Sequence, residues 1–278
     1  MPSSEHPLFK QHPRTGTAFI SIGEVPIPYQ IYNGYGLFIG GVGELEVVQR
    51  LLHHEALTPV QTADGKAILG LWICNFTAAS LGPHHELQIS FFVSRRPLAP
   101  LPNNPLNTLA ILLTRPNIHM LCYGLWNNTP QVVAYNRELL SLNAQLTSSA
   151  ITRNRQHISF SFAAADTQQP VLTGTIGQPQ RTSVAAGLAL LRIIGFRRSM
   201  ALARQPWVSM PVLNPVGVVL SHNAAAETFT HNDVNAVRYY DHRLDRLDFG
   251  ATPYQALQFM PQCVQYMDGF KFVYLQPT

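Results

Sequence analysis

The segment His84–Ser94 strongly limits how this chain folds, because its polar and apolar side chains alternate residue by residue. The polar set is His84, Glu86, Gln88 and Ser90, and the mainly apolar set is His85, Leu87, Ile89 and Phe91. Successive side chains of a β-strand point to opposite faces, so a period of two indicates a strand. The pattern predicts that one face lies on a core, while the face with the carboxylate meets solvent or a wet cavity.

Similar strand patterns recur along the chain, separated by glycine, proline and asparagine. They lie at residues 18–22, 36–39, 67–76, 157–162, 171–176, 207–219, 254–266 and 270–275. Helical spacing of apolar residues is limited to residues 44–54, 106–114, 132–142 and 183–204. We therefore predict a mainly β (α+β) fold, in which an antiparallel sheet is closed or nearly closed and a few helices are peripheral.

The length of 278 residues is compatible with one large β domain. We predict a single domain at residues 15–278, preceded by a flexible, polar N-terminal arm at residues 1–14. Hydrophobic residues make up 46% of the chain and charged residues only 12%, so uncharged polar side chains must cover much of the surface. A weakly charged surface favours self-association, and we expect a homo-oligomer.

Several partner classes are disfavoured by the same sequence. The net charge of +4 includes no basic run that would follow a nucleic acid backbone. The longest apolar stretch, residues 184–196, is too short to span a bilayer and contains Arg192, and no secretory signal pattern opens the chain. The spacing of Cys74, Cys122 and Cys263 fits neither a zinc site nor a disulfide framework. We predict a cytoplasmic protein that binds no nucleic acid or membrane.

Two segments resemble a known family. Leu81-Gly82-Pro83-His84-His85-Glu86-Leu87 follows a predicted helix and an Ala-Asp-Gly hairpin, and it resembles the Gly-x-Tyr-x-Glu strand of the acetoacetate decarboxylase superfamily. Further on, residues 135–145 (Tyr-Asn-Arg-Glu-Leu-Leu-Ser-Leu-Asn-Ala-Gln) resemble that family's Gly-Arg-Glu-x-x-Gly-x-Pro-Lys-Lys segment. The order and spacing agree over roughly residues 30–150. The resemblance implies a cone-shaped β-barrel with its active site in the cavity, and oligomers.

The catalytic lysines of that family have no counterpart in this alignment. In the family, the first lysine forms a Schiff base with a β-keto acid, and the second lowers its pKa. Here those positions are Ala144 and Gln145, neither of which forms an imine. The family's tyrosine before the acid becomes His84, and its proline becomes Asn143. This chain therefore resembles a family member that has lost Schiff-base chemistry.

Three lysines occur elsewhere in the chain. Lys10 lies in the predicted arm and Lys66 on a predicted hairpin tip, where a solvated ammonium is expected. Lys271, between two phenylalanines, is the better stand-in for the missing amine. A charge that keeps an edge strand soluble is the simpler explanation of Lys271.

We predict a catalytic set of Glu86, His84 and Arg137, of which the resemblance implies Glu86 and Arg137. Glu86 aligns with the family's strand glutamate, and Arg137 with the arginine of its Arg-Glu pair. A cavity carboxylate acts as a general acid or base if burial raises its pKa, and an arginine grips a substrate carboxylate. His84 shares the face of Glu86 and is a candidate proton relay. The plainer alternatives are a half-exposed strand glutamate and surface ion pairs.

Four residues near these positions are predicted to bind substrate: Glu138, Tyr135, Trp126 and Asn143. The block of aromatic and amide residues at 123–128 is typical of ligand-lining segments and of tight turns alike. His84 and Glu86 lack evident third and fourth metal ligands, and Gly40-Gly41-Val42-Gly43 lacks the P-loop lysine. We therefore expect neither a metal nor a cofactor.

The leading functional hypothesis is an enzyme, lyase- or isomerase-like, that performs acid/base chemistry without a Schiff base. Dehydration, isomerisation and cyclisation of a small keto or polyketide-like substrate, as in secondary metabolism, all fit. One alternative is a non-catalytic barrel that binds a small keto or carboxylate-bearing molecule. Another is a decarboxylase that uses a displaced lysine such as Lys271.

Overall fold

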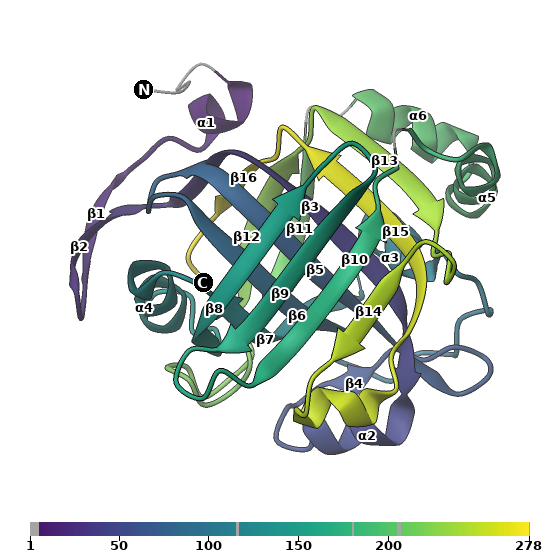
Figure 1. Cartoon of the computed structure of the whole chain (residues 1–278), viewed down its shortest axis with the longest axis horizontal. Coiled ribbons are helices and arrows are strands. Elements are labelled where there is room, and N and C mark those ends of the chain that lie inside the picture. The colour runs from purple at the N-terminus through teal and green to yellow at the C-terminus, as the bar shows by residue number, and fades with distance from the viewer. Residues whose placement is uncertain (1–5, 115–116, 180, 205–206, 278) are drawn as a thin grey trace.

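Seven strands close into a ring at the centre of the molecule (Figure 1). The computed structural model describes residues 6–114, 117–179, 181–204 and 207–277. The ring consists, in spatial order, of β7 (His119–Asn127), β11 (Val208–Leu213), β12 (Ala225–His231), β16 (Lys271–Tyr274), β3 (Tyr29–Glu44), β5 (Lys66–Ala79) and β6 (His84–Ser94). The pairing of β6 with β7 closes it. The prediction of a closed, mainly β sheet is confirmed.

A second set of strands continues from β7 and lies in front of the ring in Figure 1. It consists of β8 (Ala144–Arg153), β9 (His157–Ala164), β10 (Pro170–Gly177) and β14 (Arg246–Phe249). Most pairings are antiparallel as predicted, but β7 pairs in parallel with β8 and with β11. The first parallel pair arises because helix α4 (Pro130–Glu138) joins β7 to β8 as a crossover.

The two sets of strands enclose two hydrophobic cores. Leu87, Ile89 and Phe91 on the outer face of β6 pack with apolar residues of β8, β9 and β10 in the outer core. The inner face of β6 points into the ring, where a separate inner core lies. Both faces of β6 are therefore enclosed, and its polar face meets a cavity rather than bulk solvent.

The remaining strands are short or peripheral. They are β1 (Gly16–Ile20), β2 (Gly23–Ile27), β4 (Thr58–Pro59), β13 (Val234–Tyr239) and β15 (Met260–Asp268). β1 and β2 form a separate hairpin that projects from the body of the molecule (Figure 1).

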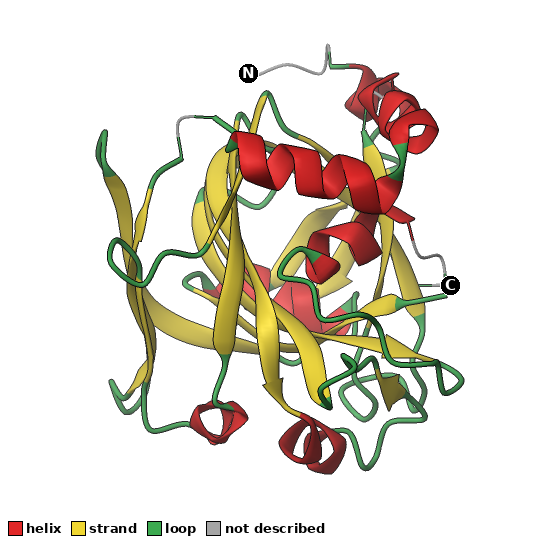
Figure 2. Cartoon of the chain, turned by 90° about the vertical axis from the view of Figure 1, so that its right-hand side faces the viewer, coloured by secondary structure: helices red, strands yellow, loops and turns green. Residues whose placement is uncertain are grey.

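The helices lie around the sheet (Figure 2). Besides α4 they are α1 (Pro7–Gln11), α2 (Leu45–Leu51), α3 (Asn107–Thr114), α5 (Val184–Ile194), α6 (Phe196–Arg204) and the short 3-10 helix Pro253–Leu257. The single helix predicted at residues 183–204 is divided at Gly195, whose φ of +83° lies in the left-handed region that favours glycine. Within the described residues, no helix is both long and apolar enough to cross a membrane.

The predicted N-terminal arm differs from the structure from residue 6 onward. Residues 7–11 form α1, and its Leu8 and Phe9 are buried against Val273 of β16. This part of the predicted arm is therefore a short docked helix, held by two apolar side chains. Residues 1–5 lie outside the described residues.

Candidate functional site

A cavity of 40 Å³ lies inside the seven-stranded ring. Side chains from β5, β6, β7, β11, β12 and β16 line it, and most of them are aromatic or aliphatic. The polar groups in the lining come from Glu86, Gln88, Thr228, Thr230 and Tyr274. A small, largely apolar space with a few polar groups that point into it is typical of a small-molecule site.

Glu86 reaches this cavity from the inner face of β6. Burial raises the pKa of its carboxyl group from 4.5 to about 7, and a hydrogen bond from Asn127 partly opposes that shift. Asn127 Nδ2 donates to Glu86 Oε2 at 3.1 Å, and Asn136 Nδ2 donates to Asn127 Oδ1 at 2.9 Å. The two buried amides orient the carboxyl group, which is populated in both protonation states near neutral pH, as a general acid/base requires.

Tyr274 adds a hydroxyl group to the same cavity. Within the described part of the chain, this buried hydroxyl has no hydrogen-bond partner. Burial and the nearby Cys122 and Glu86 raise its pKa well above 10, so the group stays protonated and able to donate. A buried polar group without a partner is costly, and a ligand oxygen would satisfy it.

His84 lies behind the cavity wall rather than in its lining. Its Nδ1 is 2.9 Å from the Gly82 carbonyl oxygen, which only accepts, so Nδ1 carries the proton. Its Nε2 then accepts from the Tyr29 hydroxyl at 2.6 Å. Burial lowers the pKa of His84 to about 4, so the ring is neutral at physiological pH. The structure thus engages both ring nitrogens away from the cavity and leaves neither for a ligand.

The structure does not bring Arg137 to Glu86. Helix α4 faces the barrel through Val132, Tyr135 and Asn136, whereas Arg137 and Glu138 are exposed in its last turn. The Glu138 carboxylate accepts hydrogen bonds from the backbone N and the hydroxyl of Ser21, at 2.8 and 2.5 Å, and so ties the β1–β2 turn to α4. The phase of the helix directs Asn136, not Arg137, toward Asn127, which in turn contacts Glu86.

The other predicted binding residues also lie outside the cavity lining. Tyr135 is buried against Tyr29, with 5.5 Å between ring centroids. Trp126 belongs to the outer core and packs edge-on against Tyr254 at 5.5 Å. Asn143 is exposed. Trp126 pairs with Leu87 across the strands and therefore shares the apolar face of β6.

Among the described residues, no lysine lies in the cavity lining. Ala144, aligned with the imine-forming lysine, is buried in the inner core. Lys66 Nζ pairs with Glu44 at 2.7 Å. Lys271 Nζ lies 2.7 Å from Asp233 and 2.9 Å from the Gly269 carbonyl oxygen, on the face of β16 opposite to the cavity-lining Phe272.

Sequence reasoning missed Tyr274 and the amides of Asn127 and Asn136. Phe270, Phe272 and Tyr274 alternate with a period of two, so the pattern at the C-terminus already contained the signal for a shared face. The amides carried no comparable signal, because their role depends on the pairing of β6 with β7.

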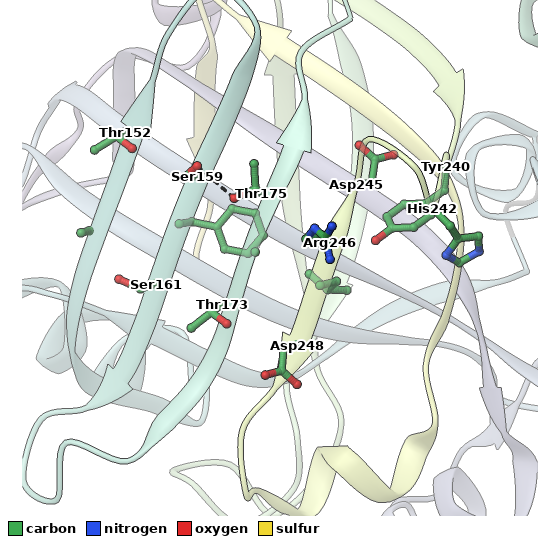
Figure 3. Close-up of a pocket in the computed structure, with 14 residues that line it drawn as sticks. Thr152, Ser159, Ser161, Thr173, Thr175, Tyr240, His242, Asp245, Arg246 and Asp248 are labelled. Carbon is green, nitrogen blue, oxygen red and sulfur yellow. Dashed lines mark hydrogen bonds between the residues drawn. The ribbon is translucent and has the colours of Figure 1, made fainter.

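A second hollow is an open groove of about 810 Å³ on the outward face of β8, β9, β10 and β14 (Figure 3). Thr152, Ser159, Thr175 and Arg246 lie side by side across the four strands, and the Ser159 and Thr175 hydroxyls are 3.0 Å apart. The groove contains two carboxylates: Asp248 is exposed, and the buried Asp245 is held by Arg238 at 2.6 Å. Proton transfer favours a carboxyl group that is shielded from water and is not neutralised by a cation. We therefore place the candidate active site at Glu86, inside the ring.

Comparisons with known proteins agree with this architecture. The acetoacetate decarboxylase of Legionella pneumophila subsp. pneumophila superposes with a TM-score of 0.56 at 10% identity, over 90% of this chain and 86% of that one. Another acetoacetate decarboxylase structure gives 0.52 at 11% identity, over 90% and 87%. The enduracididine biosynthesis enzyme MppR, complexed with pyruvate, gives 0.50 at 10% identity, over 89% and 87%.

No protein-family model and no curated protein sequence matches the chain. At sequence identities of 10 to 11%, the structural similarity establishes the fold of the chain. The predicted resemblance is confirmed at that level: the chain has the acetoacetate decarboxylase-like fold, an α+β barrel built around a large curled sheet.

Proposed function

We propose that this protein catalyses proton transfer beside the carbonyl group of a small keto compound, with Glu86 as the general acid/base and without a Schiff base. The observation that carries the proposal is a carboxyl group with a pKa of about 7 that shares a cavity with the Tyr274 hydroxyl, which has no hydrogen-bond partner among the described residues. Removal of a proton next to a carbonyl group is a first step available to dehydration, isomerisation and cyclisation alike.

In this mechanism, ionised Glu86 takes a proton from the carbon beside the carbonyl group. The C–H electron pair moves onto the carbonyl oxygen, and the Tyr274 hydroxyl donates a hydrogen bond to the enolate that forms. Protonated Glu86 then returns the proton to the ligand. Asn127 keeps the carboxyl group oriented throughout, because its amide holds one of the two oxygens.

The cavity favours a neutral ketone over a carboxylate. Its lining contains no lysine, arginine or histidine within the described chain, and a carboxylate there would lose its hydration without a cation to replace it. The pyruvate complex of MppR supports a keto ligand in this fold. For this chain we infer that the keto group enters the cavity and that any acid group stays outside.

The test is hydrogen exchange of 2-butanone in deuterated buffer, followed by proton NMR. The native protein should speed the exchange of hydrogens next to the carbonyl group, and Glu86→Gln should slow the catalysed rate by about 100- to 10,000-fold. The matched control is Glu46→Gln, which changes an exposed glutamate on α2 and should retain the native rate. Unchanged exchange in Glu86→Gln would refute the proposal.

Two further measurements separate the alternatives. Calorimetric binding of 2-butanone without any exchange would identify a non-catalytic binding barrel. Borohydride trapping of acetoacetate on Lys271 would identify a decarboxylase with a displaced lysine. We expect no trapped adduct, because the Lys271 ammonium pairs with Asp233 on the face of β16 that is turned away from the cavity.

A further inference from the structure

The Glu86 cavity adjoins two larger ones. A cavity of 250 Å³ shares the wall residues Trp72, Met210 and Thr230 with it. A cavity of 230 Å³ shares Met120 and Met210 with it. Met210 on β11 therefore borders all three spaces, and its unbranched thioether side chain is one that adapts readily to a ligand.

The Glu86 cavity alone is too small for more than a reacting group. A water molecule takes about 30 Å³ of liquid volume, so 40 Å³ admits only a few non-hydrogen atoms. Anything attached to the carbonyl group must continue into an adjoining space. Drug-sized ligands usually occupy pockets of about 300 Å³ or more, a size that the Glu86 cavity reaches only together with its neighbours.

The 250 Å³ cavity suits an apolar chain. It lies between the barrel and helices α3 and α5, and Leu109, Leu112, Leu190 and Met267 are among its walls. The 230 Å³ cavity, in contrast, includes Arg198 of α6 and Ser209 in its walls. Among the described residues, the lining of the 250 Å³ cavity includes no charged side chain, whereas that of the 230 Å³ cavity includes Arg198. The uncharged walls therefore point to the 250 Å³ cavity as the place for hydrocarbon.

The polar groups of the 250 Å³ cavity are largely engaged with one another. The Thr182 hydroxyl accepts from the backbone N of Val237 at 3.2 Å, and Gln265 Nε2 donates to Asn235 Oδ1 at 2.9 Å. Asn232 Oδ1 has no partner within the described chain, so the cavity also accommodates a hydroxyl group on the chain.

We propose that the ligand of the Glu86 site is an aliphatic ketone whose apolar chain occupies the 250 Å³ cavity between the barrel and helices α3 and α5, with Met210 at the junction. This inference rests on the proposed function for the position of the keto group. It assigns the specificity for the chain to α3 and α5, which lie outside the barrel ring.

The test is a series of 2-butanone, 2-hexanone and 2-octanone, with binding measured by calorimetry and hydrogen exchange by NMR. Binding should tighten about fourfold per added methylene until the cavity is filled, as expected from about 0.8 kcal/mol for each buried CH₂ group. Equal affinity across the series on the native protein would overturn the inference without any variant.

A matched pair of variants on α5 locates the chain. Leu190→Trp places an indole in the 250 Å³ cavity and should abolish the gain in affinity from 2-butanone to 2-octanone. Leu188→Trp changes a residue that is 52% exposed on the same helix and should keep the gain. A full gain in folded Leu190→Trp would refute the placement; if that variant unfolds, Leu190→Phe is measured the same way.

Glu86→Gln separates this inference from the proposed function. If the variant loses hydrogen exchange while 2-octanone still binds more tightly than 2-butanone, both the acid/base role and the chain cavity stand. If exchange persists and the gain is present, the acid/base role fails and the chain cavity stands. If exchange is lost and no chain length binds better than another, the acid/base role stands and the chain cavity fails.

Discussion

Replacement of Glu86 by glutamine should make the protein more stable at alkaline pH. The pKa of Glu86 is raised from 4.5 to about 7 by burial, so the folded protein holds this proton more tightly than the unfolded chain does. The resulting stability is fully present below about pH 4.5 and is lost as pH rises toward 7. Above pH 7, the native fold carries the ionised carboxylate of the half-buried Glu86 at its full cost.

The size of this cost follows from the two pKa values. At about 1.4 kcal/mol per pH unit, the interval from 4.5 to about 7 corresponds to about 3 kcal/mol. Glutamine has nearly the shape of the protonated acid, and its carbonyl oxygen accepts from Asn127 Nδ2 as the carboxyl group does. The variant therefore keeps the hydrogen bond and avoids the ionisation.

Urea unfolding, followed by far-UV circular dichroism at one fixed protein concentration, measures this effect from about pH 4.5 to pH 8.5. The stability of Glu86→Gln minus that of the native protein should rise by about 3 kcal/mol over this range. The same difference for the exposed control Glu46→Gln should stay nearly constant. A flat difference for Glu86→Gln would refute the reasoning, because it would mean that the carboxylate is hydrated in the folded protein.

Two further substitutions probe the same cavity through the exchange of 2-butanone. Tyr274→Phe should slow exchange by about 100-fold, because the enolate oxygen loses its hydrogen-bond donor. Its stability should be unchanged or improved, because the lost hydroxyl has no partner in the described chain. Slowed exchange together with a large loss of stability would argue for a structural role. Asn127→Ala removes the hydrogen bond that lowers the pKa of Glu86, so the alkaline rise of the exchange rate should move to higher pH; an unchanged pH profile would contradict the assigned role of Asn127.

The strand bearing Glu86 could be predicted closely because its signal is local. The predicted and observed bounds of β6 coincide at His84–Ser94. A long polar/apolar alternation allows only one assignment of side chains to the two faces of the strand. The region from β12 to β14 was not predicted, because its strands lack a long alternating pattern. Leu8 and Phe9 were missed because a two-residue apolar cluster is too short to register as periodicity.

The candidate site was predictable only in part, since an alignment gives a position along the chain and not a direction in space. The segment at 135–138 does lie near Glu86, yet the residue that reaches the Glu86 network is Asn136, through Asn127. The contact of Asn136 with Asn127 depends on the pairing of β6 with β7 and on the rotational phase of helix α4. Neither is encoded in the local pattern that identified Glu86.

The two-core design explains how the barrel tolerates a carboxyl group that weakens it at alkaline pH. Strands β8, β9 and β10 cover the outer face of β6, so Leu87, Ile89 and Phe91 are buried in the outer core. Burial of such side chains contributes about 1.5 to 3 kcal/mol each. Together the three side chains contribute about 4.5 to 9 kcal/mol. This sum exceeds the cost of about 3 kcal/mol for ionised Glu86 on the opposite face of the same strand. The outer core thus stabilises β6 through its outer face, and the inner face of the strand presents Glu86 and Gln88 to the cavity.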